Sequence, residues 1–281
     1  MKRKPKPSNQ QSAKRLMLDT RLRDRLTVRS ILSIIVIIII FRQFWIGNYE
    51  NVFIGLLTLV LFAVPGFIDR RLGIDLPPAL ETVVFLFIFA AEILGEISSF
   101  FTKVPYWDAM LHTVTGFLMA AVGFALVDIL NRNENVSFRL SPFFLSVVAF
   151  CFSMTIGVLW EFFEFAADQL LHIDMQKDSI VTAINTVKLD PNGLNVVHHV
   201  DIENVVVNGE DWTALLGGYL DIGLIDTMKD LFVNFIGAVV FSVIGFFYVK
   251  NRGRGKLARS LIPRVKARRD SETALSEETE K

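Results

Sequence analysis

Six apolar runs limit the folds that this chain can adopt. A helix needs about 20 mostly apolar residues to cross the hydrocarbon core of a bilayer. Six stretches approach that length: residues 31–46, 52–68, 80–98, 109–130, 143–165 and 228–249. The first two are the shortest, and Phe and Trp at their margins extend them as interfacial anchors. The sequence therefore predicts an all-α polytopic membrane protein with six transmembrane helices.

The composition agrees with this class and excludes several others. The chain is 52% hydrophobic and contains 25 Phe, which is more apolar than an ordinary soluble domain. Its single cysteine, Cys151, cannot form an intramolecular disulfide. No nucleotide-binding glycine loop, HExxH motif or cysteine-based metal motif is present. The first apolar run lacks the small-residue cleavage pattern of a signal peptide.

Lys and Arg are concentrated on one side of the predicted spans. Residues 1–29 carry ten Lys or Arg and two Asp, and residues 250–269 carry nine basic residues and no acid. With the N-terminus inside, most of the other Lys and Arg also fall in cytoplasmic loops, as the positive-inside rule requires. We therefore expect a multi-pass membrane protein with both termini in the cytoplasm.

The segment between the fifth and sixth spans differs in composition from the rest of the chain. Residues 168–226 contain ten Asp or Glu and two Lys, and "VKLDPNGLNVV" (187–197) has a Pro-Asn-Gly turn signal between β-branched residues. The predicted organisation is a basic cytoplasmic tail (1–29), a membrane domain (30–250) and a charged cytoplasmic tail (251–281). A small β-containing extracytoplasmic insert (169–225) interrupts the membrane domain. The tails are expected to be disordered or to lie against anionic lipid, and nucleic acid is not an expected partner.

Acidic residues recur at helical spacing near one end of four predicted spans. The stretch "GVLWEFFEFAADQ" (157–169), for example, ends the fifth span with three acids. Residues three, four, seven or eight apart return to the same helix face. With the predicted orientation, the four polar stripes all lie at the outer end: Glu92 and Glu96; Asp108 and His112; Glu161, Glu164 and Asp168; Asp226, Asp230 and Asn234.

Carboxylates gathered at one depth repel one another unless a counter-charge is present. We therefore expect an outward-facing pocket that binds a divalent cation, namely Mg²⁺, Mn²⁺ or Ca²⁺, or Zn²⁺ if the imidazole takes part. The expected metal ligands are Asp108, His112, Glu161, Glu164, Asp168, Asp226 and Asp230. Glu92, Glu96 and Asn234 are expected to line the same pocket. If the protein is an enzyme, His112, Glu161 and Asp230 are the candidate catalytic residues.

Structural roles are the alternatives for several of these residues. Asp226 suits the N-terminal end of a helix, where an acid interacts favourably with the macrodipole. His112 could be a core histidine bonded to one carboxylate. Gly116 and Gly237 are more typical of close helix packing than of a binding site. The adjacent His198 and His199 would point to opposite faces of a strand, so they are a weak metal signal.

Three motifs, "WDAMLHTVTG", "LWEFFEFAAD" and "DTMKDLFVNFIGA", resemble the YjdF-like family of bacterial membrane proteins. More distantly they resemble VanZ-like proteins, which share Asp-x-x-x-His, Glu and Asp-x-x-x-Asn-x-x-Gly on successive spans. The YjdF-like resemblance extends to "DMQ" (174–176). Because the YjdF-like family has no assigned activity, this resemblance implies none for the chain. The VanZ-like resemblance implies a role at the cell envelope. The long acidic insert departs from the VanZ-like pattern.

Three functional classes remain open at this point. The first is an enzyme in which the cation acts on a lipid-linked envelope precursor. The second is an ion or solute transporter, since acids within membranes often mark ion pathways. The apolar centres of the predicted spans and the lack of an obvious repeat speak against transport. The third is a non-catalytic membrane factor with a structural cation site. The sequence does not determine the oligomeric state.

Overall fold

The computed structural model describes residues 28–71, 74–131, 140–251, 261–262 and 264–265 of the 281-residue chain. Most of both predicted tails and the loop at 132–139 therefore lie outside the described residues. The chain divides into two compact units, Met1–Met154 with Asn234–Lys281 and Thr155–Val233, called here the first and the second unit. Each unit is described by itself.

Five helices in the described part of the chain are long and apolar enough to cross a membrane. They are Val28–Ile46, Tyr49–Phe67, Trp107–Asp128, Pro142–Leu171 and Leu224–Lys250. They correspond to five of the six predicted spans. Along the second of these stretches, α2 (Tyr49–Leu61) is followed by α3 (Val64–Arg71). The chain is mostly helical, as the apolar runs predicted.

The predicted third span, 80–98, is not one of these five helices. It consists of α4 (Pro78–Ile88) followed directly by a π-helix, η1 (Phe89–Ile97). The wider turn shows at its end, where both the N–H and the hydroxyl of Ser98 donate to the carbonyl of Ile93, five residues back. π-Helical turns are rare and are frequent at functional sites. The short helix α5 (Phe100–Lys103) follows.

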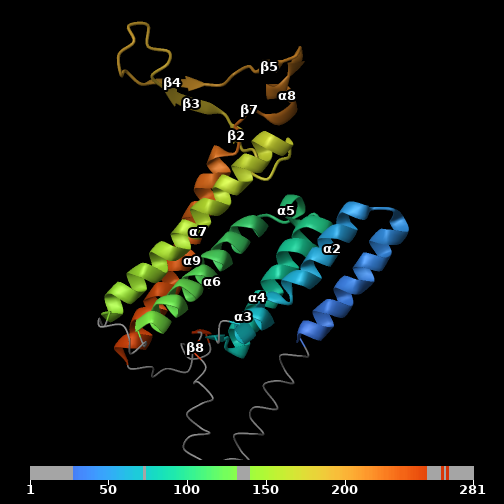
Figure 1. The fold of residues 1–281 in the computed structure, drawn as a ribbon. Helices are drawn as coiled ribbons and strands as arrows, with labels where there is room; N and C mark the ends of the chain where they lie inside the picture. Colours follow the sequence, from blue (N-terminus) through green and yellow to red (C-terminus); the bar gives the residue numbers. More distant parts are fainter. Residues whose placement is uncertain (1–27, 72–73, 132–139, 252–260, 263, 266–281) are drawn as a thin grey trace, which may run out of the picture. The chain divides into compact units, whose positions relative to one another are not determined.

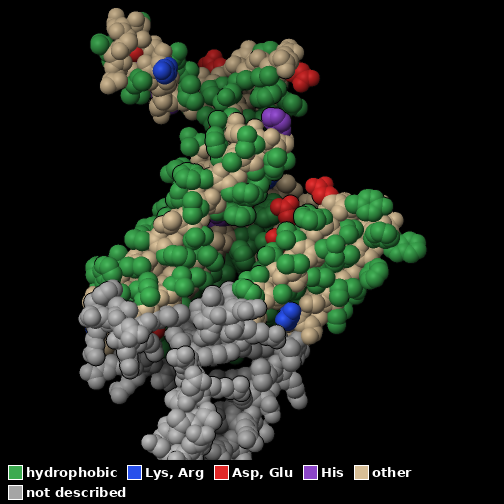
Figure 2. Space-filling view, in the orientation of Figure 1, with side chains coloured by type: hydrophobic (Ala, Val, Ile, Leu, Met, Phe, Trp, Pro, Cys, Tyr) green, Lys and Arg blue, Asp and Glu red, His purple; other side chains and the backbone are tan. Residues whose placement is uncertain are grey.

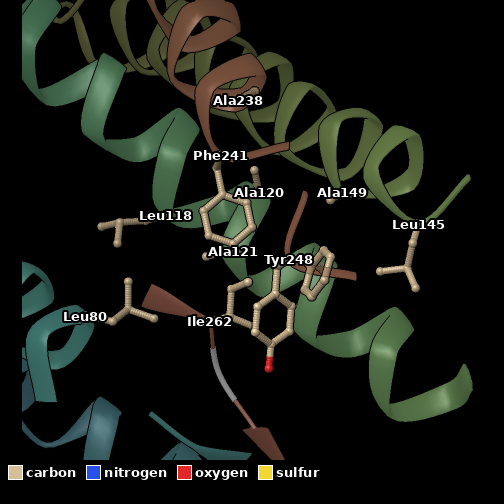
Figure 3. Packing of buried hydrophobic residues seen from close by; sticks show 11 residues of the cluster. Leu80, Leu118, Ala120, Ala121, Leu145, Ala149, Ala238, Phe241, Tyr248 and Ile262 are labelled. Atoms are coloured by element: carbon tan, nitrogen blue, oxygen red, sulfur yellow. The ribbon is translucent and has the colours of Figure 1, made fainter. Parts of the chain in front are cut away.

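The core of the first unit lies where α4, α6 (Trp107–Asn131), the start of α7 (Pro142–Leu171) and the end of α9 (Leu224–Lys250) pack together. Figure 3 shows this cluster, with the ring of Phe241 among small residues such as Ala120 and Ala121. Phe241 packs edge-on against Phe117 and Phe124, at ring-centroid distances of 5.1 and 6.0 Å. Small residues beside large rings let these helices approach closely.

Two further features complete the first unit. A second cluster joins the first two helices to α4 and η1 through Leu32, Val36, Phe62, Phe85 and Ile93. Near the C-terminus, β8 (Arg264–Val265) pairs antiparallel with β1 (Ile74–Asp75), and Ile262 is buried in the main core. The described C-terminal residues thus return to this unit.

Large apolar side chains are exposed along the membrane helices. Ile38, Phe41 and Phe53 are more than half exposed, and Figure 2 shows hydrophobic side chains covering much of the visible helix surface. In water such contiguous apolar surfaces are rare on a monomer. Lipid is the natural solvent for them.

The second unit contains the end of α7, the start of α9 and a chain of small antiparallel sheets between them (Figure 1). β2 (Ile180–Val181) pairs with β7 (Tyr219–Leu220), β3 (Ala183–Thr186) with β4 (His198–Asp201), and β5 (Val206–Val207) with β6 (Glu210–Asp211). A short helix, α8 (Trp212–Leu216), follows β6. The predicted β-containing insert is confirmed, and its Pro-Asn-Gly segment lies in the loop that joins β3 to β4.

Candidate functional site

Three helices meet around Gly116 in the first unit. A Cβ at Gly116 would overlap the backbone carbonyl of Asn234 on α9, and a Cβ at Gly237 would overlap the carbonyl of Thr113 on α6. From α7, the buried Ser153 hydroxyl donates a 2.7 Å hydrogen bond to the carbonyl of Gly116. The structure therefore favours helix packing as the role of the two glycines. We call this contact of α6, α7 and α9 the junction.

The side chain of Asn234 is buried inside the junction. Its Nδ2 donates to the Sδ of Met154 on α7, at 3.5 Å. Ser153 and Asn234 are both buried polar residues at this contact. Near the other end of α6, Asp128 is also buried.

Asp108 and His112 form a pair in the first two turns of α6. The Nε2 of His112 lies 3.6 Å from Oδ1 of Asp108, at the i,i+4 spacing that the sequence predicted. His112 is buried and Asp108 is half-buried. Gly116 follows His112 by one further turn, so this polar stripe leads along α6 to the junction.

Glu161 and Glu164 form a second pair, on α7 in the second unit. Each offers a carboxylate oxygen within 4.8 Å of the other, and the side chains are only 3% and 8% exposed. The neighbouring Phe162 is 65% exposed. This part of α7 therefore hides its acids and presents its aromatic residues, which is the reverse of a helix in water and typical of a helix in lipid.

Asp230 on α9 follows the same pattern. It is 3% exposed, whereas Met228 and Phe232 beside it are well exposed. Glu92 and Glu96 differ from it, because they lie on the π-helix η1, where Glu92 is half-buried and Glu96 is exposed. The three deepest acids among the candidate residues are therefore Glu161, Glu164 and Asp230.

Asp168 and Asp226 hold the segment that follows α7. The two carboxylate oxygens of Asp168 accept the backbone N–H groups of Met175 (2.6 Å) and Gln176 (2.8 Å). Asp226 accepts the N–H of Lys177 at 2.9 Å, and the Gln176 side chain donates to the hydroxyl of Thr227. These contacts favour a structural role for both acids. They also explain the "DMQ" motif (174–176), which lies in the segment 174–177 that the two acids anchor; we call this segment the strap. The assignment of the two acids as metal ligands stays a prediction.

Asp221 completes this anchoring and was not among the predicted residues. Its carboxylate accepts the N–H groups of Ser179 (2.6 Å), Ile225 (3.0 Å) and Gly223 (3.4 Å). Burial alone would raise the pKa of Asp221, but these donors and the charge of Lys229 outweigh it and hold the pKa below its ordinary value. The sequence signal that could have indicated this role is the position of the acid, just before the first turn of the sixth span.

Asp178 shows the opposite effect. Burial, followed by the negative charges of Asp174, Asp221 and Asp168, raises its pKa.

In the insert, His199 contacts Asn185 at 2.8 Å and Asp201 at 3.4 Å, while burial alternates along β4. This alternation agrees with the expectation that His198 and His199 point to opposite faces.

The helices and their inverted polarity are those of an integral membrane protein with several spans. The chain belongs to the family described as predicted membrane proteins (DUF2238), whose pattern matches residues 27–251. This is the YjdF family, in agreement with the nearer of the two resemblances. The more distant VanZ-like resemblance stays a prediction.

One curated relative adds to this. An uncharacterized protein of Thermotoga maritima is 23% identical over 130 residues, which is 46% of this chain. The chain spans 57% of that relative's length. No solved structure matches the sequence.

Proposed function

We propose that this protein binds a divalent cation in a polar site within its membrane helices. The site would be built on Glu161 and Glu164 of α7 and Asp230 of α9, with His112 of α6 as a nitrogen ligand. One observation carries the proposal: two buried carboxylates of one helix lie within 4.8 Å of each other. A pair of this kind is costly to keep charged in lipid unless a proton or a cation joins it.

Helix periodicity supports the inclusion of His112 and Asp230. On α6, His112 precedes Gly116 by one turn, and on α9, Asp230 precedes Asn234 by one turn. Gly116 and Asn234 meet at the junction, and both helices run the same way from it, since Phe124 packs against Tyr248 further along. Each of these two side chains therefore lies one helical turn before a residue of the junction.

The finer topology belongs to the proposal. The chain would cross the bacterial plasma membrane six times, with α4 and η1 as the third span, both termini in the cytoplasm and the acidic site toward the outer face. This orientation is supported by the distribution of Lys and Arg, which are concentrated in the tails and loops on the side of the spans opposite to their acidic ends. Asp168 and Asp226, which hold the strap by hydrogen bonds, are expected to lie at the entrance of the cation site.

A catalytic role would use this cation on a lipid-linked envelope substrate. A bound dication polarises a phosphate oxygen or activates water. His112 or Glu161 would then act as the general base. The VanZ-like resemblance of the motifs is what points to the envelope.

Metal analysis of the purified protein tests the proposal. Full-length protein in detergent is expected to retain close to one equivalent of a divalent metal after gel filtration. Glu161→Gln and Asp230→Asn should lose it while keeping the elution profile and helix content of the wild type. Glu203→Gln, at an exposed acid of the insert, is the matched control and should retain it. Equal metal content in all four proteins, or none in the wild type, would refute the site.

Cation transport is a second candidate, and the junction favours it. The buried polar side chains of Ser153 and Asn234 extend the polar stripe beyond the acids. Manganese uptake into liposomes containing the protein, abolished by Asp230→Asn, would support transport. Metal binding without uptake would leave an enzyme or a non-catalytic factor with a structural cation.

A further inference from the structure

Asn234 is the most completely buried of the polar candidate residues. Its side chain is 1% exposed, and its Oδ1 atom has no hydrogen-bond partner among the residues that the structure describes. The other amide atom, Nδ2, donates to the Sδ of Met154. The amide therefore has its N–H side occupied and its oxygen side available.

Helix packing does not account for this side chain. The contact between α9 and Gly116 is made by the backbone of Asn234, which any residue would supply. A buried carbonyl oxygen without a hydrogen bond is destabilising, and an apolar residue of similar size would avoid that cost. Such atoms in a native protein call for an explanation, of which an ion is one.

We infer that Oδ1 of Asn234 is a ligand of the divalent cation and that Met154 is a positioning residue that orients it. This inference rests on the proposed function and deepens it. Asn234 follows Asp230 by one turn of α9, so both side chains share one helix face. An amide oxygen beside carboxylates is a hard ligand set, which suits Mg²⁺, Mn²⁺ or Ca²⁺.

Met154 supplies the orientation. A side-chain amide can turn either its oxygen or its nitrogen toward a ligand. A thioether sulfur is a weak acceptor and cannot donate, so it pairs only with the N–H side. With Nδ2 on Met154, Oδ1 is directed elsewhere. Met154 lies on α7, seven residues before Glu161, which is two helical turns along the same face.

Three variants of the full-length protein in detergent test the inference, with Mn²⁺ binding followed by titration and by electron paramagnetic resonance. Asn234→Leu removes the oxygen and is expected to weaken Mn²⁺ binding by at least about tenfold. Asn234→Asp keeps an oxygen but, like Asn234→Leu, loses the N–H to Met154, and it should bind Mn²⁺ at least as tightly as the wild type. Met154→Leu conserves volume and should weaken binding by less than Asn234→Leu.

The outcomes separate this inference from the proposed function. If Asn234→Asp binds as poorly as Asn234→Leu, the residue acts through its contact with Met154 and is not a ligand. Wild-type affinity in Asn234→Leu would also overturn the ligand role, and wild-type affinity in Met154→Leu would overturn the positioning role. If the wild type itself binds no Mn²⁺, both the inference and the proposed function fail. Thermal melting of each variant shows whether it remains folded.

Discussion

The backbone carbonyl of Asn234 lies directly against Gly116, so that α9 and α6 touch main chain to main chain. Only glycine permits this approach, because any Cβ at position 116 would overlap a backbone atom that cannot rotate away. The close packing of α6 against α9 therefore requires glycine at position 116. The same holds for Gly237 against Thr113.

Gly116→Ala should destabilise the protein. Forcing one extra carbon into a packed contact typically costs about 1–3 kcal/mol, so the melting temperature in detergent should fall clearly. Gly66→Ala is the control, because a Cβ at Gly66 in α3 meets nothing within 4 Å and alanine is the better helix former. Equal melting temperatures for both variants would contradict the close contact.

Ser153→Ala removes the hydrogen bond from α7 to the Gly116 carbonyl. A typical intramolecular hydrogen bond contributes about 0.5–1.5 kcal/mol net, so a smaller loss of stability than in Gly116→Ala is expected. Thermal melting measures it. A gain in stability would show that the hydroxyl is not needed to hold α7 at the junction.

Asp168→Asn should loosen the strap after α7. The carboxylate accepts two backbone N–H groups with two oxygens, and an amide has only one oxygen for them. Hydrogen exchange of the Met175 and Gln176 amides is expected to accelerate, while exchange in the membrane helices stays unchanged. Glu203→Gln should alter neither. If Asp168→Asn lost bound metal and left the strap protected, the acid would be a ligand and not an anchor.

The pH dependence of stability should carry opposite signs at Asp221 and Asp178. The folded pKa of Asp221 is depressed, so its contribution is present above the unfolded pKa and is lost as pH falls through the folded pKa. Asp221→Asn should therefore destabilise the protein at pH 7 and by progressively less toward pH 3. The folded pKa of Asp178 is raised, so Asp178→Asn should stabilise it at pH 7. Melting curves from pH 7 to 3 measure both effects, and like signs would contradict these environments.

Much of the fold follows from periodicity alone. Apolar runs of sufficient length gave five membrane helices, and turn signals among β-branched residues gave the sheets of the insert. The switch at Phe89 from α4 to the π-helix η1 has no comparable signal, because the apolar run 80–98 continues through it without a break in composition. The pairing of β8 with β1 was likewise unpredictable, since two-residue strands carry no measurable pattern.

The candidate site, like the fold, was predictable from the sequence only in part. Helical spacing predicted the Asp108–His112 and Glu161–Glu164 pairs, because residues of one helix fix each other's positions. It did not predict that the oxygens of Asp168 hold a backbone segment. That contact depends on where the chain turns after α7. Met154 and Ser153 were missed because a single Met or Ser within an apolar run is indistinguishable from packing.

The most direct test of the cation site is anomalous scattering from crystals grown with Mn²⁺. The account predicts one strong anomalous peak within bonding distance of carboxylate oxygens of both Glu161 and Glu164, absent from crystals of Glu161→Gln. No peak at that pair, or a peak only among exposed acids such as Asp174 and Glu203 of the insert, would contradict it.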